Sequence, residues 1–446
     1  MFRPWTVDGR VVVVAGLAAV FGVACSGGAR RDAPAPGPKQ SAEISLGRID
    51  RANAYPSVAA LGKTVAVAWN ARNELQSDVY VSVSTDGGAT FGEATRVNDL
   101  VKDASINGEQ PARIVIAPGN VLHVVWPSRQ DGRAVLRYAS STDLGRSFTK
   151  PATIVGDREP GIRGWHSVAI GHDGGVHTLW LDGRNATPHQ HGARTSGSGA
   201  APGASMGKGP RQDVFHAAWK GDGPRTENAV AADVCFCCKT AIATAGDRVY
   251  AAWRHIYPGS VRDIAVARST DNGASFAAPA RLSDDNWKIE ACPDDGPSMA
   301  ADSHGGIHLA WPTLVAGDQP RKGIFYASLD GTGPGMTFSP RLRLDAGDGD
   351  AAHPQIASDD HGNTAIVWDE RVHLRPSGSG GQAGERRRIV VRLVSGGAAA
   401  PAERFEGAGV SYPAVAAADG HWIVVWPQQT PDGSSLIAGR RLKFQH

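Results

Sequence analysis

The chain has 446 residues, with 46 Lys and Arg against 44 Asp and Glu, so its formal net charge is only +2. Such a balance gives no sign of a nucleic-acid partner, which selects strongly basic surfaces. Beyond the first 25 residues no apolar run is long enough to span a bilayer. No motif requires a cofactor, and we expect none.

The N-terminus has the features of an export signal. Arg3 and Arg10 precede an apolar stretch, residues 11–23, that is too short for a comfortable membrane span and is typical of a secretory signal peptide. Gly22-Val23-Ala24-Cys25 looks like the end of a bacterial lipoprotein signal, which implies a lipidated Cys25 and an anchor in the cell envelope, expected in the outer membrane. Gly22 stands where such signals usually have Leu, so plain secretion remains an alternative.

The next segment, residues 26–41, contains Pro, Gly and Ala and cannot pack a core, so it is predicted to be a flexible tether. Residues 42–446 repeat one unit instead of dividing into several domains. A strand ending in Trp recurs every 54 to 73 residues, at Trp69, Trp126, Trp180, Trp253, Trp311, Trp368 and Trp426.

Each of these strands follows a short run of small apolar residues, such as 56–60, and precedes two further strand-like runs, such as 78–84 and 93–97. Four strands per repeat are typical of a propeller blade. The sequence therefore predicts an all-β propeller with seven four-stranded blades. A fourth-strand-like segment, 43–49, precedes the first unit, and the last unit lacks one, so this N-terminal strand is expected to close the ring.

Three copies of one turn follow strands of alternating apolar residues: 84–91, 141–148 and 269–276. They share the pattern Ser-Thr-Asp-x-Gly-x-(Ser/Thr)-Phe, in which Gly suits a left-handed turn position and Asp can accept turn amides. This pattern resembles the Asp-box, or BNR repeat, of the sialidase superfamily. The resemblance implies a structural role for Asp86, Gly88, Asp143, Gly145, Asp271 and Gly273. Familiar sialidases have six blades, so six is the alternative to seven.

The face opposite these turns is the one that binds substrate in sialidases. Five blades place Arg within four residues after the repeated Trp, and a guanidinium fork suits bidentate capture of a carboxylate. The resemblance implies a sialic-acid carboxylate held by Arg129, Arg184, Arg254 and Arg371. The alternative is that each Arg pairs with an acidic neighbour in its own blade.

Sialidases also use a Tyr nucleophile activated by Glu, together with an Asp acid/base. The resemblance assigns these roles to Tyr412, Glu290, Asp182 and Asp369. Tyr55 and Glu109 occupy comparable positions in the first and second units. The chain departs from the family at Ala54, where an Arg is expected, and in its extra blade.

Four cysteines follow Cys25: Cys235, Cys237, Cys238 and Cys292. The order Cys-x-Cys-Cys, Arg-Asp-Ile, Asp-box and Ala-Cys-Pro resembles a group of exported bacterial sialidase-like proteins over about 70 residues. Bonding the neighbours Cys237 and Cys238 would be strained, so Cys292 is expected to pair with one of them, and Cys235 with the other or with nothing. A thiolate zinc site and a reactive thiol remain alternatives, and we assign no metal.

The leading hypothesis is therefore an exported, lipid-anchored, monomeric glycoside hydrolase that acts on acidic, sialic-acid-type glycans. The competing hypothesis is a surface lipoprotein that uses the same face to bind glycan or protein without catalysis.

Overall fold

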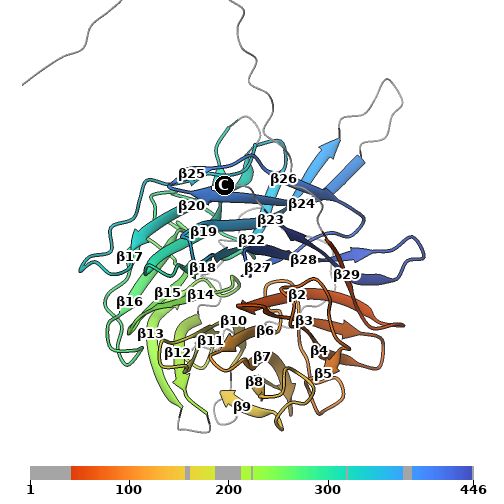
Figure 1. Ribbon diagram of the computed structural model, residues 1–446. Coiled ribbons are helices and arrows are strands. Elements are labelled where there is room, and N and C mark those ends of the chain that lie inside the picture. The colour runs from red at the N-terminus through yellow and green to blue at the C-terminus, as the bar shows by residue number, and fades with distance from the viewer. Residues whose placement is uncertain are drawn as a thin grey trace, which may run out of the picture. The chain divides into compact units, whose positions relative to one another are not determined.

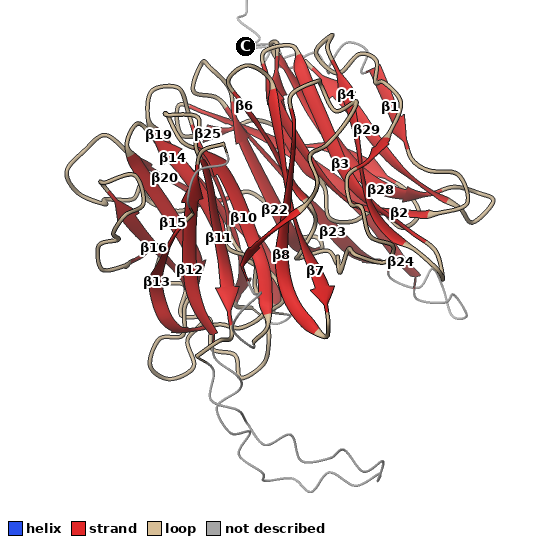
Figure 2. Cartoon of the chain, turned by 90° about the horizontal axis from the view of Figure 1, so that it is seen from below, coloured by secondary structure: helices blue, strands red, loops and turns tan. Residues whose placement is uncertain are grey.

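The computed structural model describes residues 42–155, 161–185, 212–221, 225–317, 320–374 and 384–443. These segments form strands, turns and loops, and no membrane-crossing helix is found among them. Figure 2 shows the strands of the sheets with their connecting loops. The predicted signal peptide, Cys25 and the tether lie outside the described residues.

Seven antiparallel sheets confirm the predicted seven-bladed β-propeller, and six blades is wrong. The first four blades contain β2 (Ala52–Leu61), β3 (Thr64–Arg72), β4 (Ser77–Ser84) and β5 (Thr95–Arg96); β6 (Arg113–Ala117), β7 (Val121–Gln130), β8 (Arg133–Ser141) and β9 (Ala152–Val155); β10 (Arg163–Ile170), β11 (Val176–Asp182), β12 (Gln212–Trp219) and β13 (Thr226–Val234); and β14 (Ala241–Ala245), β15 (Arg248–Arg254), β16 (Ile264–Ser269) and β17 (Ala280–Arg281).

The remaining blades contain β18 (Ser298–Ala301), β19 (Gly306–Val315), β20 (Arg321–Asp330) and β21 (Leu342–Arg343); β22 (Asp350–Ser358), β23 (Thr364–Leu374), β24 (Gly384–Ser395), β25 (Ala398–Ala399) and β26 (Glu403–Glu406); and β27 (Ala414–Ala418), β28 (His421–Gln429), β29 (Ser435–Leu442) and β1 (Ala42–Leu46). In the sixth blade the outer edge is split, because β25 and β26 both pair with β24.

The ring closes as predicted. The innermost strands contact one another in turn around a common axis, and β27 of the last blade lies against β2 of the first (Figure 1). The N-terminal strand β1 pairs antiparallel with β29, with Ile44 opposite Gly439, and so supplies the outer strand of the last blade. Residues far apart in the sequence thereby fasten the two ends of the propeller to each other.

The seven repeated tryptophans are buried between the blades. Each indole N–H finds an acceptor, which removes the cost of burying that polar group. The acceptors are Asn53, Asp103, Asp182, His255, Asp285, Glu370 and Gln428. Four of them are carboxylates, and each of these also pairs with at least one Arg.

The three Asp–Gly turns join the third and fourth strands of blades one, two and four. In the third, Asp271 accepts hydrogen bonds from the backbone N–H and hydroxyl of Ser275, at 2.9 and 2.6 Å. With Ser269 these bonds lower the pKa of Asp271 to about 2. The glycine of the turn adopts a φ of 86°, and a Cβ there would lie 2.3 Å from His216 of the preceding blade. Only glycine lets this turn dock so closely.

Candidate active site

A central cavity of about 400 Å³ runs along the axis between the innermost strands. Small and aliphatic side chains form most of its wall, and Arg113, Lys239, Ser298 and Gln355 add polar groups. Lys239 lies two residues before β14 and lines the cavity, so it joins this cavity to the loops at one end. That end, which we call the mouth, lies on the face opposite the Asp–Gly turns.

One position of the repeat surrounds the mouth, either just before an innermost strand or at the irregularity near its beginning. Sequence alignment of the repeats places Tyr55, Gln110, Trp165, Cys238, Gly296, His353 and Tyr412 there. Four of these residues have left-handed backbones, with φ of 55°, 52°, 56° and 44° at Tyr55, Trp165, His353 and Tyr412.

Large side chains rarely adopt this conformation, and it costs free energy at each position. In three of the four blades the pairing register shifts at this place, between Ala54 and Ser57, Gly164 and Ser167, and Ala352 and Gln355. The inserted residue of a β-bulge redirects its side chain. Strain that recurs at one edge of a channel marks a candidate site for function.

The aromatic side chains of the mouth contact one another. The rings of His353 and Tyr412 stack with centroids 3.8 Å apart, and Tyr55 meets Tyr412 edge-on at 5.6 Å. A Cβ at Gly108 would lie 2.1 Å from Cζ of Tyr412, so only glycine leaves room for this phenol. We call these three rings the aromatic surface of the mouth.

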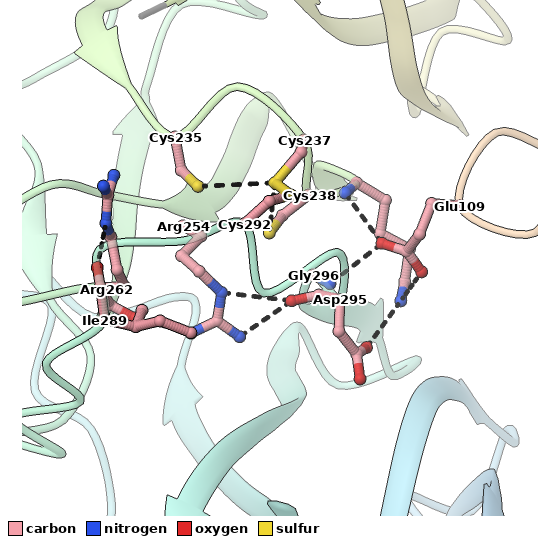
Figure 3. The surroundings of a disulfide bond; sticks show 11 residues. Glu109, Cys235, Cys237, Cys238, Arg254, Arg262, Ile289, Cys292, Asp295 and Gly296 are labelled. Atoms are coloured by element: carbon pink, nitrogen blue, oxygen red, sulfur yellow. Dashed lines mark hydrogen bonds and ion pairs between the residues drawn. A yellow bond between two sulfur atoms is a disulfide. The ribbon is translucent and has the colours of Figure 1, made fainter. Parts of the chain in front are cut away.

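Glu109 is buried beneath this surface. Its carboxylate accepts the backbone N–H of Gly296 at 3.1 Å (Figure 3). It also accepts the backbone N–H of Lys239 at 3.1 Å and lies 3.3 Å from the Lys239 ammonium. Three segments from blades two, four and five therefore meet on one side chain. Removal of its charge would leave the buried ammonium without its main partner.

Asp295 is fully buried beside Glu109 and binds the other cations of the mouth. Its carboxylate lies 3.0 Å from the Lys322 ammonium and 3.9 Å from that of Lys239, and it accepts the N–H of His353 at 3.1 Å. Burial would raise the pKa of Asp295, but Lys322, His353 and Lys239 lower it to about 2. Asp295 is therefore ionised at any physiological pH.

Its neighbour Asp294 has the opposite behaviour. Partial burial and the charges of Glu109 and Asp295 raise the pKa of Asp294, although His353 and Lys322 oppose them. Much of the residue nevertheless remains exposed to solvent, unlike Asp295. Adjacent carboxyl groups whose environments drive their proton affinities apart are a recurring feature of acid/base sites.

Asp369 joins the aromatic surface to the acidic cluster. Its carboxylate accepts Nδ1 of His353 at 2.7 Å and the N–H of Tyr412 at 2.9 Å. Burial alone would lower the pKa of His353, but the charges of Asp369 and Asp295 raise it. Burial, with the charges of Glu109 and Asp369, raises the pKa of Tyr412. The phenol is therefore held neutral.

Ligand atoms of Glu109, Asp295 and His353 lie within 4.8 Å of one another, so these residues could surround a cation. Lys239 and Lys322 already neutralise the two carboxylates, however. A metal ion would have to displace both ammonium groups, which makes this cluster a poor metal site.

The four predicted carboxylate-binding arginines do not line the central cavity. Arg184 pairs with Asp182 and Glu227. Arg254 is buried and donates to the backbone carbonyls of Asp295, Arg262 and Pro312. Arg371 lies 3.4 Å from Glu385, with half of its side chain exposed, and Arg129 is exposed. Arg184 and Arg371 therefore pair with acidic residues of their own blades, as the alternative interpretation of the sequence expects.

The predicted catalytic residues are also separated. Tyr412 and Asp369 come together at the mouth, whereas Glu290 is exposed in the loop that follows β17. Asp182 is fully buried and accepts the indole N–H of Trp180 and the guanidinium groups of Arg163 and Arg184. Its contacts are those of a blade-packing residue.

Sequence reasoning did not single out Asp294, Lys239, Lys322 or His353. A usable signal was present for one of them, because His353-Pro354 repeats Tyr55-Pro56 and Tyr412-Pro413 at the start of an innermost strand. Glu109, named only as comparable to Glu290, is the glutamate that the fold brings to the mouth.

The cysteines lie next to this site. Cys237 and Cys292 form a disulfide with Cα atoms 6.2 Å apart, as one of the expected pairings (Figure 3). Cys235 and Cys238 are buried and carry free thiols, so the cluster has one disulfide and not two. A hydrogen bond with Cys238, helped by Arg254 and Arg262, lowers the pKa of Cys235 to about 6 despite its burial.

No protein-family model and no curated protein matches the chain. Solved structures of similar fold include a protein of unknown function from Dyadobacter fermentans, at 14% identity and a TM-score of 0.49, covering 92% of this chain and 100% of that one. An alpha-L-arabinanase of Penicillium chrysogenum is 14% identical, with a TM-score of 0.48, over 75% of this chain and 94% of that one. A sialidase of Trypanosoma rangeli is 13% identical, with a TM-score of 0.47, over 88% of this chain and 55% of that one.

Proposed function

We propose that this protein is a glycan-active propeller that hydrolyses a glycosidic bond at the mouth of its central cavity. One observation carries the proposal. At the mouth, His353 and Tyr412 have left-handed backbones and both donate hydrogen bonds to the carboxylate of Asp369, and nearby Asp294 has a raised pKa. Glycoside hydrolysis needs this combination: a surface for the sugar, a proton donor and a carboxylate.

Asp294 is the proton donor in this proposal. Its raised pKa keeps a fraction of the carboxyl group protonated, and its exposure lets it reach the oxygen of the leaving group. Asp369 supplies the negative charge that stabilises an oxocarbenium-like transition state or attacks it. Tyr412 provides a stacking face, since its raised pKa opposes the phenolate that a Tyr nucleophile would need.

The charges of the mouth favour a neutral sugar. Four carboxyl groups, those of Glu109, Asp294, Asp295 and Asp369, influence the Tyr412 phenol. Lys239 and Lys322 balance only two of them, and His353 balances a third when it is protonated. The fourth, Asp294, is the proton donor and is neutral when protonated, so these side chains together carry little net charge, which suits a neutral sugar. Specificity for sialic acid stays a prediction from the family resemblance, and its expected arginines lie outside the cavity wall.

Glycan binding without hydrolysis is the second candidate. It is favoured by the hydrogen bonds from His353 and Tyr412 that already occupy the Asp369 carboxylate, which leave this group little freedom to react. In that case the aromatic surface would bind the sugar and Asp294 would only donate a hydrogen bond to it.

A hydrolysis screen separates these candidates. The purified full chain is incubated with 4-methylumbelliferyl glycosides of neutral pyranoses and furanoses, uronosides and α-sialosides, and the same compounds without the fluorophore are titrated for binding. We expect turnover of a neutral glycoside that Asp294→Asn and Asp369→Asn abolish, while the exposed Asp131→Asn does not. Binding without turnover would support the second candidate. Turnover of sialosides alone, lost in Arg371→Ala, would overturn the neutral-sugar proposal.

Export and lipid anchoring are proposed on the N-terminal sequence alone. If Cys25 is lipidated, cells fed a radiolabelled fatty acid will label the wild-type chain and not Cys25→Ser. Release of unlabelled wild-type protein into the medium would favour plain secretion.

A further inference from the structure

We infer that Cys235, Cys237, Cys238 and Cys292 form a tetrathiolate site for zinc, which is filled when the Cys237–Cys292 disulfide is reduced. The four residues come from two loops, those that lead into β14 and β18, so no other part of the chain must move to assemble the site. Cys235, Cys237 and Cys238 are buried, and Trp165, Phe236 and Ile256 pack around them. Closed surroundings of this kind are typical of structural zinc sites.

Three of the four sulfur positions have the spacing of a tetrahedral site. Sγ of Cys237 lies 3.9 Å from Sγ of Cys235 and 3.9 Å from Sγ of Cys238, and all three sulfurs lie within 4.8 Å of one another. Four Zn–S bonds of about 2.3 Å place neighbouring sulfur atoms about 3.8 Å apart. Only Cys292, bonded to Cys237, must withdraw to complete the set.

A single disulfide does not explain why two further cysteines lie so close to it. Cys237 has a free cysteine at the same distance on two sides in addition to its partner Cys292. Thiol–disulfide exchange among sulfurs so placed would scramble the pairing. One metal ion engages all four sulfurs together.

The surroundings supply positive charge. A zinc ion with four thiolates carries a net charge of −2, which needs compensation in a buried site. The charges of Arg254 and Arg262 both act on Cys235 (Figure 3). Nη1 of Arg262 is buried and, among the described residues, has no hydrogen-bond partner. Backbone N–H groups of Cys237 and Asp295 donate to Cys235 and Cys238, as second-shell donors do at metal sites.

The redox step is balanced by a dithiol. The dithiol is oxidised to its own disulfide, and its two electrons and two protons convert Cys237–Cys292 into two thiols. Zinc then binds as the four thiols release their protons. Cys292 is partly exposed, so a small reductant can reach the bond.

The site would also support the mouth. Lys239, which holds Glu109, directly follows Cys238, and the N–H of Asp295 donates to Cys238. Binding or loss of zinc would therefore shift the residues that set the charge of the mouth.

Metal analysis tests this inference without any glycan assay, so its outcome is separate from that of the proposed function. The full chain is reduced with a phosphine, given one equivalent of zinc and desalted without oxygen. We expect about one zinc per chain in the reduced protein and less than about 0.1 in the oxidised protein or in Cys238→Ser. Cys25→Ser, which removes a cysteine outside the cluster, should keep its zinc. Circular dichroism checks that each variant is folded.

Two further measurements locate the metal. Cobalt in place of zinc should give thiolate-to-cobalt charge-transfer bands and the d–d bands of a tetrahedral site. His353→Gln, which removes the histidine of the other possible cation site and lies outside the cysteine loops, should bind zinc as wild type does. Zinc that binds regardless of reduction, that survives in Cys238→Ser, or that is lost in His353→Gln would overturn the inference, as would a reduced, folded wild type that binds none.

Discussion

The tryptophan position and the mouth position both recur once in every blade, but the first always holds the same residue type and the second does not. The first position holds Trp in all seven blades, always buried and always with a partner for its indole N–H. The second holds Tyr, Gln, Trp, Cys, Gly, His and Tyr in turn. Identical contacts between blades stabilise a ring, whereas a site for one ligand needs different groups that converge. The position with the same residue in every blade therefore stabilises the fold, whereas the position with different residues forms the candidate site.

The largest effect is expected in the symmetric layer. Trp311→Ala should lower the free energy of unfolding by about 3–5 kcal/mol, because it opens a cavity between two blades. Denaturant unfolding measures the change. Leu75→Ala, at a side chain that is 70% exposed, is the control and should change stability by less than about 0.5 kcal/mol. A loss below about 1 kcal/mol for Trp311→Ala would show that this layer does not hold the ring together.

A change at the mouth should affect activity instead. Asp294→Asn should reduce kcat/KM by about 10²–10⁴, because it removes a proton donor, with stability nearly unchanged at an exposed position. Asn also tolerates the left-handed backbone at this residue, where φ is 47°. Steady-state kinetics on the best substrate provide the test. Full activity in this variant would exclude Asp294 as the donor.

The stability contributed by the mouth should depend on pH through His353. Because the pKa of folded His353 is raised, its protonated form stabilises the fold below its unfolded pKa of about 6.5, and this contribution disappears as the pH rises through the raised value. The stability difference between wild type and His353→Gln should therefore shrink as the pH rises from about 5 to about 9, a range that includes the unfolded pKa of His353. The exposed His304→Gln is the control. A constant difference for His353→Gln would contradict the ion pair with Asp369.

The smallest effect on hydrolysis is expected from the exposed Arg371–Glu385 pair. Arg371 and Glu385 are both about half exposed, and such pairs contribute at most about 1 kcal/mol. Arg371→Ala should therefore change hydrolysis of a neutral glycoside by less than about twofold. A large rise in KM for a sialoside alone would restore the arginine-based prediction.

The fold could be predicted because its signals are local and repeated. Trp spacing gives the blade count, and the missing outer strand of the last blade predicts the pairing of β1 with β29. The Asp–Gly turns can be recognised from their residue pattern alone. The site could not be predicted in the same way, because Glu109, Asp295 and His353 are distant in sequence and meet only when the ring closes.

The arginines show that one local pattern can have two causes. Arg184 follows Trp180 closely because Asp182 accepts the indole N–H and attracts a guanidinium group. Packing of a buried tryptophan therefore produces the same motif as a carboxylate-binding site. The left-handed backbones of Tyr55 and Tyr412 have no sequence signature either, since neither residue type favours that conformation.

A crystal structure of the protein with the glycan that binds best in the screen, obtained with Asp294→Asn to slow turnover, tests the proposed site most directly. If the mouth is the active site, a sugar ring will lie there, in contact with Tyr412 and within hydrogen-bond distance of residues 294 and 369. A sugar bound instead at Arg129 or Arg371, or on the face of the Asp–Gly turns, would contradict it.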